Sequence, residues 1–426
     1  LQRACARLGV PQPIRSYLGS LYKQSRTKIC YGGQIVTDDV ETARGVKQGA
    51  PSSCSLFNAV MDLVTGSIRA DMGAEVAKGT RVSHLLFADD TVLVANTPEL
   101  LQISLRKFMD ELEGVGLSLN PSKSSALVIR HTRGIWGVDS GVSIVDKDGN
   151  KLPLLGVRDT YKYLGIQFGS VGVEWQPAQE VLVSGLHEIT TAPLHAGQRL
   201  YILRNHLIPK LMHVLVLAMA PRQFLVNMDR LVRASVTSWV GIPRHSALGL
   251  IHGGIAAGGL SVPRLAKVVP LLQRNRLQSL ERSAGGDEVL AAVVKTDYYR
   301  KLVTRSLKPV KVGTAGVEVS SRQQVDAEYS RWLKEEAPDG CVARGIDFNV
   351  KTGRWLSMAH FLGQLSGAEV KQMLRVRLGL LPTPNRLGRI GQDSLLHCDC
   401  RTRHKGSLGH IMQKCARSKP ARMKSH

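Results

Sequence analysis

The chain has 426 residues, 43% of them hydrophobic, which is typical of a globular protein with a large core. Its 57 Lys and Arg against 34 Asp and Glu give a formal charge of +23, which predicts a polyanionic partner such as nucleic acid. No apolar run reaches the roughly 18 residues of a spanning helix, and the seven scattered cysteines argue against a secreted disulfide framework. Because the chain starts at Leu1, without a Met, we expect a fragment of a longer protein.

In chain order, "IRSYLGSLYKQS" predicts a helix and "TKICYGGQIVT" a strand-like run with a Gly-Gly turn. A glycine-rich loop then leads into a helix with apolar residues Leu56, Val60, Leu63 and Val64 on one face. The strand-turn-strand "HLLFADDTVLVA" follows, and an amphipathic helix is expected from about Thr97 to Val115. This order predicts an α/β layer, an antiparallel sheet covered by helices.

Beyond this layer the pattern becomes helical, from about Gln176 to Gln278, with basic residues scattered through it. A Gly-rich interruption precedes one more predicted helix, which includes Leu271, Leu272 and Leu277. Residues 282–395 have weaker periodicity and several Gly and Pro breaks, so we assign them only as a helical linker region.

Two adjacent carboxylates, Asp89 and Asp90, interrupt the apolar stretch "SHLLFADDTVLVAN". Side by side they repel each other unless a positive charge lies nearby, and a divalent cation is the obvious counter-charge. Mg²⁺ is normally held by one or two carboxylates plus substrate phosphates. The alternative is that "ADD" is only a polar hairpin turn.

The segments on either side favour the metal site. Upstream, "RGVKQGAPSSCSLFN" contains Gly45 and Gly49, which allow close backbone approach to a ligand, and Gln48, which offers donors and an acceptor. Downstream, "GLSLNPSKSSALVI" carries Lys123 on a loop, and "YLGIQF" follows. In this order, the four segments resemble the successive palm motifs of reverse transcriptases, the last being the primer-grip hairpin.

The resemblance implies template-directed addition of deoxynucleotides to a primer 3′-hydroxyl with two Mg²⁺ ions. It implies that Asp89 ligates metal, that Asp90 assists or tunes it, and that Lys123 lies near the leaving pyrophosphate. The alternative for Lys123 is a solvated loop lysine. The residues expected to line the nucleotide and template pocket are Gly45, Gln48, Gly49 and Phe87.

A narrower resemblance covers nearly the whole chain. "QRLYILRNHLIPKLMHVLVL", "GGLSVP" and a terminal Cys/His cluster resemble site-specific non-LTR retrotransposons of the R-two clade, which insert into large-subunit ribosomal RNA genes. The implied partners are an RNA template, target DNA and deoxynucleoside triphosphates, in the nucleus and without a membrane, with an endonuclease domain beyond this chain.

The implied fold is an α/β palm with an antiparallel sheet, an all-α thumb and a small C-terminal zinc knuckle. The predicted domains are a partial palm at 1–175, a helical thumb at 176–281, the linker region at 282–395, the knuckle at 396–416 and a basic tail at 417–426.

One expected carboxylate is missing from the pattern. A two-metal polymerase site needs a further aspartate, which in this family precedes the QG loop within a phenylalanine-rich motif that is absent here. The upstream candidates are Asp38 and Asp39, in what reads as an exposed turn, and Asp62 on the helix after the loop. The simpler expectation is that the chain begins just downstream of the missing motif, so the isolated chain is predicted to be inactive.

The segment "HCDCRTRHKGSLGHIMQKC" offers Cys398, Cys400, His410 and Cys415 as a structural tetrahedral Zn²⁺ site. His397 and His404 are rival ligands, and unligated thiols are the alternative. By resemblance this is the zinc knuckle that such elements carry after the thumb.

The basic helical region supplies candidate phosphate contacts, with solvated helix faces as the alternative for each. They are Arg199, Arg204, Lys210, Arg230 and Arg233. The competing function is a non-catalytic nucleic-acid-binding protein on a degenerate polymerase scaffold. Retention of the metal hairpin, the QG loop and Lys123 together favours the enzyme, because a protein that only binds RNA needs basic residues and not Asp89.

Overall fold

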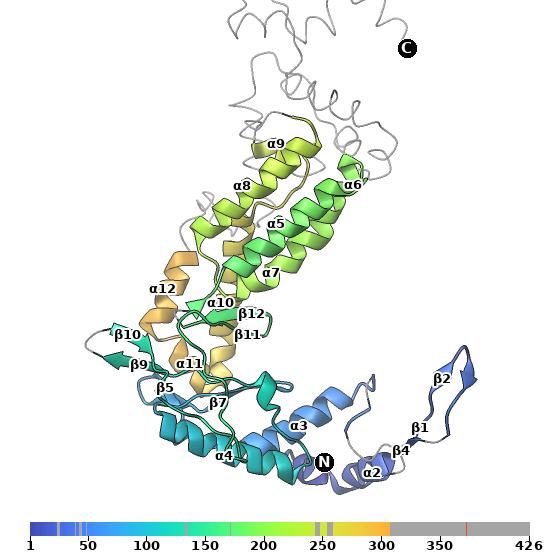
Figure 1. Cartoon of the computed structure of the whole chain (residues 1–426), viewed down its shortest axis with the longest axis vertical. Coiled ribbons are helices and arrows are strands. Elements are labelled where there is room, and N and C mark those ends of the chain that lie inside the picture. Colours follow the sequence, from blue (N-terminus) through green and yellow to red (C-terminus); the bar gives the residue numbers. More distant parts are fainter. Residues whose placement is uncertain are drawn as a thin grey trace, which may run out of the picture. The chain divides into compact units, whose positions relative to one another are not determined.

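A computed structural model of the chain is drawn in Figure 1. It describes residue 372 and residues 1–306, apart from 24–25, 39, 42–44, 48, 133–134, 171, 243–247 and 254–258. The chain divides into two units, which we call the N-terminal unit (1–174 with 280–300) and the helical unit (175–279 with the residues from 301 on). In the part described, no helix is long and apolar enough to cross a membrane.

The N-terminal unit alternates helices with short strands. Its helical elements are α1 (Gln2–Arg7), α2 (Gln12–Lys23), α3 (Ser53–Thr65), η1 (Ala70–Met72), α4 (Pro98–Gly114), η2 (Pro121–Lys123), η5 (Ala284–Gly286) and α11 (Glu288–Val293). Its strands are β1 (Arg26–Thr27), β2 (Cys30–Tyr31), β3 (Gln34–Ile35), β4 (Val40–Glu41), β5 (Ala74–Ala77), β6 (Thr80–Val82), β7 (His84–Phe87), β8 (Asp90–Leu93), β9 (Ile129–Thr132), β10 (Ile135–Val138), β11 (Tyr161–Tyr163), β12 (Ile166–Gly169) and β13 (Gly172–Val173).

The strands pair antiparallel, as predicted, but they do not form one continuous sheet among the described residues. They form separate ladders: β1 with β4, β2 with β3, β5 with β6, β7 with β8, β9 with β10, and β11 with β12 and β13. Most strands pair with the next strand along the chain, because tight turns interrupt the chain after only a few residues, whereas β1 pairs with β4 across the β2–β3 hairpin. The predicted Gly-Gly turn joins β2 to β3, with φ of 58° at Gly32 and 80° at Gly33.

Helix α4 organises the core of the N-terminal unit, as its periodicity predicted. The Thr97 side chain caps it by accepting a 3.3 Å hydrogen bond from the Leu100 amide, and Pro98 begins it. Phe108 and Leu112 pack with Met61 and Val64 of α3. The other buried apolar side chains of α4, Leu105 and Met109, pack against the segment after β10, at Ile144 and Leu152.

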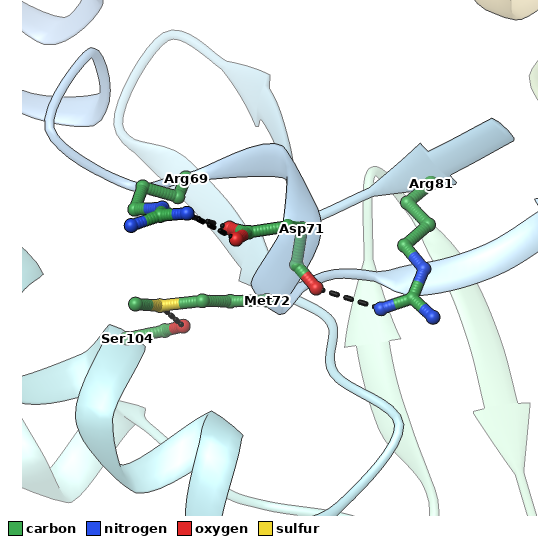
Figure 2. A network of polar contacts seen from close by, with 5 residues as sticks. All are labelled: Arg69, Asp71, Met72, Arg81 and Ser104. Carbon is green, nitrogen blue, oxygen red and sulfur yellow. Dashed lines mark hydrogen bonds and ion pairs between the residues drawn. The ribbon is translucent and has the colours of Figure 1, made fainter.

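Polar contacts stabilise the turn at Arg69–Met72, before β5, and join it to β6 and α4, as Figure 2 shows. The Arg69 guanidinium pairs with the Asp71 carboxylate, with Nε 3.0 Å from Oδ1, and this hydrogen bond lowers the pKa of Asp71. Arg81, on β6, donates to the Asp71 carbonyl oxygen at 2.7 Å. Below them the Ser104 hydroxyl of α4 lies 3.6 Å from the Met72 sulfur. The β5–β6 hairpin is thereby held over α4.

A late segment of the chain returns to the N-terminal unit. Leu280–Arg300 groups with residues 1–174, and α11 packs against β5 and β6. All but the first two residues of this segment lie in the range read from the sequence as a linker, 282–395. The Asp287 side chain begins α11 by accepting a 2.9 Å hydrogen bond from the Leu290 amide. Helix α12 (Asp297–Ser306) follows.

The helical unit agrees with the predicted helical pattern. Its elements are α5 (Gln176–Thr191), α6 (Ala196–Ile202), the π-helical turn η3 (Leu203–Leu207), α7 (Ile208–Leu217), α8 (Arg222–Trp239), α9 (Leu248–His252) and α10 (Leu265–Ser283). Pro209 explains the π-helical turn, because its ring has no N–H and crowds the carbonyl one turn earlier. Leu182, Leu203, Leu225 and Met228 are fully buried in one hydrophobic cluster.

A buried carboxylate joins two helices of this unit. Asp229 of α8 accepts hydrogen bonds from the amides of Leu265, at 2.8 Å, and Ala266, at 3.0 Å, which open α10. Burial raises its pKa, while the two amides act in the opposite direction. An aspartate from one helix therefore caps the N-terminus of another.

Candidate functional site

The predicted carboxylate pair lies at a hairpin turn. Strands β7 and β8 pair with Phe87 opposite Asp90, so Ala88 and Asp89 form a two-residue connection. Ala88 has φ of 53°, and a positive φ at the first connecting residue only is the pattern of a type II′ turn. Both carboxylates are exposed. The segment "ADD" is thus a polar hairpin turn, as the alternative interpretation predicted. The same turn also presents two accessible carboxylates that could ligate a metal ion.

The hairpin has one covered and one open face. Leu86 and Leu93 pack toward the core formed by α3 and α4. On the opposite face, cross-strand pairing aligns Phe87, 63% exposed, with Asp90, and Leu85 lies on the same side, 50% exposed. Asp90 is therefore presented beside an apolar, accessible surface of the kind that a flat substrate ring can lie against.

The Lys123 loop is fixed through its backbone. The Asn120 side chain accepts a 3.1 Å hydrogen bond from the Ser122 amide and so shapes η2. The Tyr161 hydroxyl, from β11, donates to the Lys123 carbonyl oxygen at 3.2 Å. The Lys123 side chain itself is exposed. The backbone is thus anchored while the ammonium group stays accessible.

Strand β11 also lies close to the carboxylate pair. The pKa of the Tyr163 hydroxyl is raised by burial and then by the negative charge of Asp90. Sequence reasoning did not single out Tyr161 or Tyr163 as site residues. Their i, i+2 spacing was the available signal, because alternation places both side chains on one face of a strand. Three motifs far apart in sequence, β7–β8, the Lys123 loop and β11–β12, therefore meet in one unit.

The glycine loop has the backbone that its glycines predicted. Gly45 and Gly49 have φ of 91° and 88°, which other residues rarely adopt. Apart from the adjacent residues, no described atom lies within 4 Å of a Cβ built at either position, so backbone conformation rather than crowding favours glycine. The Ser53 hydroxyl donates to the Lys47 carbonyl at 2.6 Å and ties the loop to α3. Gln48 lies outside the described residues.

The upstream acids do not join Asp89 and Asp90. Asp62 pairs with Arg7, with Nε 3.0 Å from Oδ2, and its charge acts on His84, whose pKa is lowered mainly by burial. His84 begins β7, about 10 Å of strand from the turn. Asp38 is exposed and Asp39 lies outside the described residues. The described residues contain no cluster of three or more potential metal ligands.

The exposed pair still fits the protein's part of a Mg²⁺ site. Mg²⁺ takes hard oxygen ligands and keeps water and phosphate oxygens in its shell, so two accessible carboxylates on a fixed turn are suitable donors. The zinc prediction lies elsewhere: Cys398, Cys400, His410, Cys415 and the rivals His397 and His404 all lie outside the described residues.

The predicted phosphate contacts differ in their surroundings. Lys210 and Arg230 are exposed. Arg204 is half-buried and donates to the carbonyl oxygens of Leu200, at 3.2 Å, and Leu260, at 3.1 Å, and burial lowers its pKa. Arg199 donates to the Ala192 carbonyl at 3.1 Å, and Arg233 is half-buried. Lys210 and Arg230 thus suit a phosphate contact better than Arg204, and the prediction stays open for all five.

Comparison with known proteins places the site in a family. Residues 1–168 match the family "Reverse transcriptase (RNA-dependent DNA polymerase)". The chain is 31% identical to the "Retrovirus-related Pol polyprotein from type-2 retrotransposable element R2DM" of Drosophila melanogaster, over 98% of this chain and 38% of that protein. For the R2 Pol polyproteins of Nasonia vitripennis and Bradysia coprophila the identities are 28% and 26%, over 99% of this chain and 39% and 48% of theirs.

The chain therefore spans less than half the length of these relatives. The matched region contains the glycine loop, the Asp89–Asp90 turn, the Lys123 loop and β11–β12. Residues 1–168 thus belong to the reverse transcriptase family, and nearly the whole chain is related to the Pol polyproteins of R2 retrotransposable elements, as its motifs predicted.

Proposed function

We propose that the protein is the RNA-directed DNA polymerase of a non-LTR retrotransposon of the R2 type, which extends a target DNA primer on an RNA template. The observation that carries this proposal is the exposed carboxylate pair at the β7–β8 turn, inside the region that matches reverse transcriptases. The similarity to Pol polyproteins of R2 retrotransposable elements supports the type of element.

In this function Asp89 and Asp90 would ligate the metal ion that contacts the substrates. The hydrogen-bonded pairing of β7 with β8 fixes the turn that carries both carboxylates. Mg²⁺, when bound, supplies activation of the primer hydroxyl and neutralisation of phosphate charge. Phe87, on the exposed face of the hairpin, offers a surface for a base or sugar. Gly45 and Gly49 allow the backbone of the glycine loop to lie close to the nucleotide and template. The accessible Lys123 ammonium neutralises or protonates the leaving pyrophosphate.

The finer parts of the proposal concern the rest of the protein. Residues 176–281 serve as a thumb that contacts the phosphate backbone, and Cys398, Cys400, His410 and Cys415 hold a structural Zn²⁺. The target DNA is a ribosomal RNA gene, the site of action is the nucleus, and an endonuclease is carried by the longer protein. The basic charge of the chain supports the nucleic-acid partners.

Primer extension on an RNA template tests the proposal. The 426-residue chain, whose described residues place two carboxylates at the turn and no third ligand beside them, is expected to give no extension, whereas a protein with the full length of the longer relatives is expected to be active. In the active protein, Asp89→Ala should reduce the rate by about 10³-fold or more, because a metal ligand supplies several kcal/mol at the transition state. Asp148→Ala, an exposed acid in another loop, is the matched control.

Three results would change the interpretation. Full activity of Asp89→Ala would show that the β7–β8 turn is not the catalytic metal site. Absence of extension by the longer protein, with template binding intact, would instead favour the competing function, a non-catalytic nucleic-acid-binding protein. Strong extension by the 426-residue chain would show that Asp38, Asp39 or Asp62 supplies the further ligand, and single alanine variants would identify which one.

A further inference from the structure

The segment that contains α6, η3 and α7 has an unusual charge composition. Residues 189–228 contain four Lys and Arg and no Asp or Glu, although the chain as a whole has more than one acid for every two bases. Arg199 and Arg204 donate to backbone carbonyl oxygens, which are neutral, so these contacts leave their positive charge in place. Lys210 is exposed and has no ion-pair partner among the described residues. This segment therefore carries a positive field.

The π-helical turn η3 brings two aromatic rings together on this segment. In a regular α-helix, side chains five residues apart point about 140° away from each other, because each residue rotates by about 100°. A π-helical turn instead repeats after about five residues, so such side chains come to lie on the same side. The rings of Tyr201 and His206 accordingly lie 5.9 Å apart between centroids, with their planes inclined at 56°. Single π-helical turns are frequent at functional sites, which favours a role for this pair.

The ring pair lies on the solvent side of the segment. Leu203 and Leu207 point the other way and are buried in the hydrophobic cluster of the helical unit. Tyr201 is 47% exposed, and His206 and Lys210 are exposed as well. Lys210 follows His206 by four residues, a spacing that places two side chains on the same side of a helix. We call this surface the Tyr201 face; it consists of Tyr201, His206 and Lys210.

We propose that the Tyr201 face binds an unpaired segment of nucleic acid, with a base stacked on the Tyr201 ring and a phosphate held by Lys210. Proteins hold single strands with aromatic rings beside positive charge, because every unpaired base offers a ring face. A duplex hides those faces inside its base stack. Lys210 lies about 13 Å further along the helix than Tyr201, so it would hold the phosphate of a different nucleotide from the stacked one. The absence of acids from residues 189–228 favours a polyanion over a protein surface.

The inference deepens the proposed function and rests on it for the presence of an RNA or DNA strand. It concerns the Tyr201 face of the helical unit and not the Asp89–Asp90 turn, so the two can fail separately. A binding measurement on the 426-residue chain tests the Tyr201 face, whereas primer extension tests the turn.

The test is the affinity of the chain for fluorescent oligouridine, and for the same strand paired with oligoadenylate, by anisotropy. Tyr201→Ala is expected to weaken single-strand binding by about five-fold or more, since stacking on an aromatic ring is worth at least that much. Its duplex affinity should not change. Tyr201→Phe keeps the ring and is expected to keep the affinity for both ligands. Tyr298→Ala, at a tyrosine that is 72% exposed in the N-terminal unit, is the matched control and should bind like the unaltered chain.

A photocrosslink from bromouridine-substituted oligouridine should map to Tyr201 in the unaltered chain. Single-strand affinity that is the same for Tyr201→Ala and the unaltered chain would overturn the proposal. So would an equal loss in Tyr298→Ala, or an equal loss on the duplex. If Tyr201→Ala lowers the midpoint of thermal unfolding but leaves single-strand affinity unchanged, the ring pair only stabilises the helix and the proposal is wrong.

Discussion

The Tyr161 hydroxyl donates a 3.2 Å hydrogen bond to the carbonyl oxygen of Lys123, and so joins the β11–β12 hairpin to the lysine loop. Tyr161→Phe removes only this donor. It should lower the free energy of local opening of the lysine loop by about 1 kcal/mol. The amides of Lys123 and Ser124, which donate within η2, should then exchange with solvent about five-fold faster. Hydrogen exchange read by mass spectrometry measures this, with Tyr298→Phe as control, and unchanged exchange would show that the bond does not hold the loop.

Nucleic-acid affinity should fall steeply as salt rises, because neutralised phosphates release counterions. Lys210→Gln and Arg230→Gln, at exposed positions, should each reduce the slope of log affinity against log salt by about 0.9. Arg204→Gln should instead lower the midpoint of thermal unfolding, because the carbonyls of Leu200 and Leu260 lose a donor. Anisotropy across a KCl series measures the slopes, and an affinity that is flat with salt would contradict the interpretation.

One zinc ion should bind per chain at Cys398, Cys400, His410 and Cys415, because three thiolates and an imidazole complete a tetrahedron. Cys415→Ser should abolish stoichiometric uptake, while Cys54→Ser, at an exposed cysteine near the start of α3, should leave it unchanged. Atomic absorption of the dialysed protein gives the stoichiometry. Substituting His397, His404 or His410 singly identifies the histidine, and a chain that binds no zinc or cobalt would exclude the knuckle.

Leu164 and Gly165 connect β11 to β12, and both have positive φ, 48° and 80°. A leucine in this left-handed conformation costs about 1 kcal/mol, whereas Asn-Gly is the favoured pair for a type I′ turn. Leu164→Asn should therefore raise the midpoint of thermal unfolding. Leu164→Ala keeps the Cβ and hence most of the strain, so it serves as the control. A lower midpoint for Leu164→Asn would show that the leucine side chain contributes more through packing than its backbone costs.

The pKa of Tyr299 is raised from 10.0 to about 12 by burial and by Glu281, which repels the phenolate and accepts the phenol's hydrogen bond. Because the folded protein holds this proton more tightly, the contribution to stability is complete below pH 10.0 and is lost as the pH rises through about 12. The Tyr299→Phe variant has no ionisable phenol at this position, so its stability should fall less steeply as the pH rises. Urea unfolding midpoints of both proteins, measured below pH 10.0 and as the pH approaches 12, test this. An equal fall in the two midpoints would contradict the assignment to Tyr299.

The sequence predicted those parts of the fold whose signals are local. Helix α4 followed from its apolar spacing, and the Gly32–Gly33 turn from its dipeptide. The β7–β8 hairpin followed from an apolar run broken by two aspartates. The family followed from four motifs in order, since together they are far more specific than any one alone.

Contacts between distant segments could not be predicted in the same way. The hydrogen bond from Tyr161 to Lys123 joins residues 38 positions apart, and no local pattern encodes it. In the sequence Arg204 resembles any other helix arginine. Only the structure shows that its guanidinium donates a hydrogen bond to the carbonyl oxygen of Leu260. Similarly, Asp229 was indistinguishable from a surface acid until α10 was seen to begin against it.

The return of Leu280–Arg300 to the N-terminal unit gives this unit a discontinuous chain. On the ribosome, α11 cannot reach β5 and β6 until residues 175–279 have been synthesised, a delay of roughly 5–20 s at typical elongation rates of about 5–20 residues per second. During that interval the surface that α11 covers stays open. The nascent chain therefore passes through a stage in which residues 175–279 of the helical unit have been synthesised while the unit bearing Asp89 and Asp90 still awaits α11.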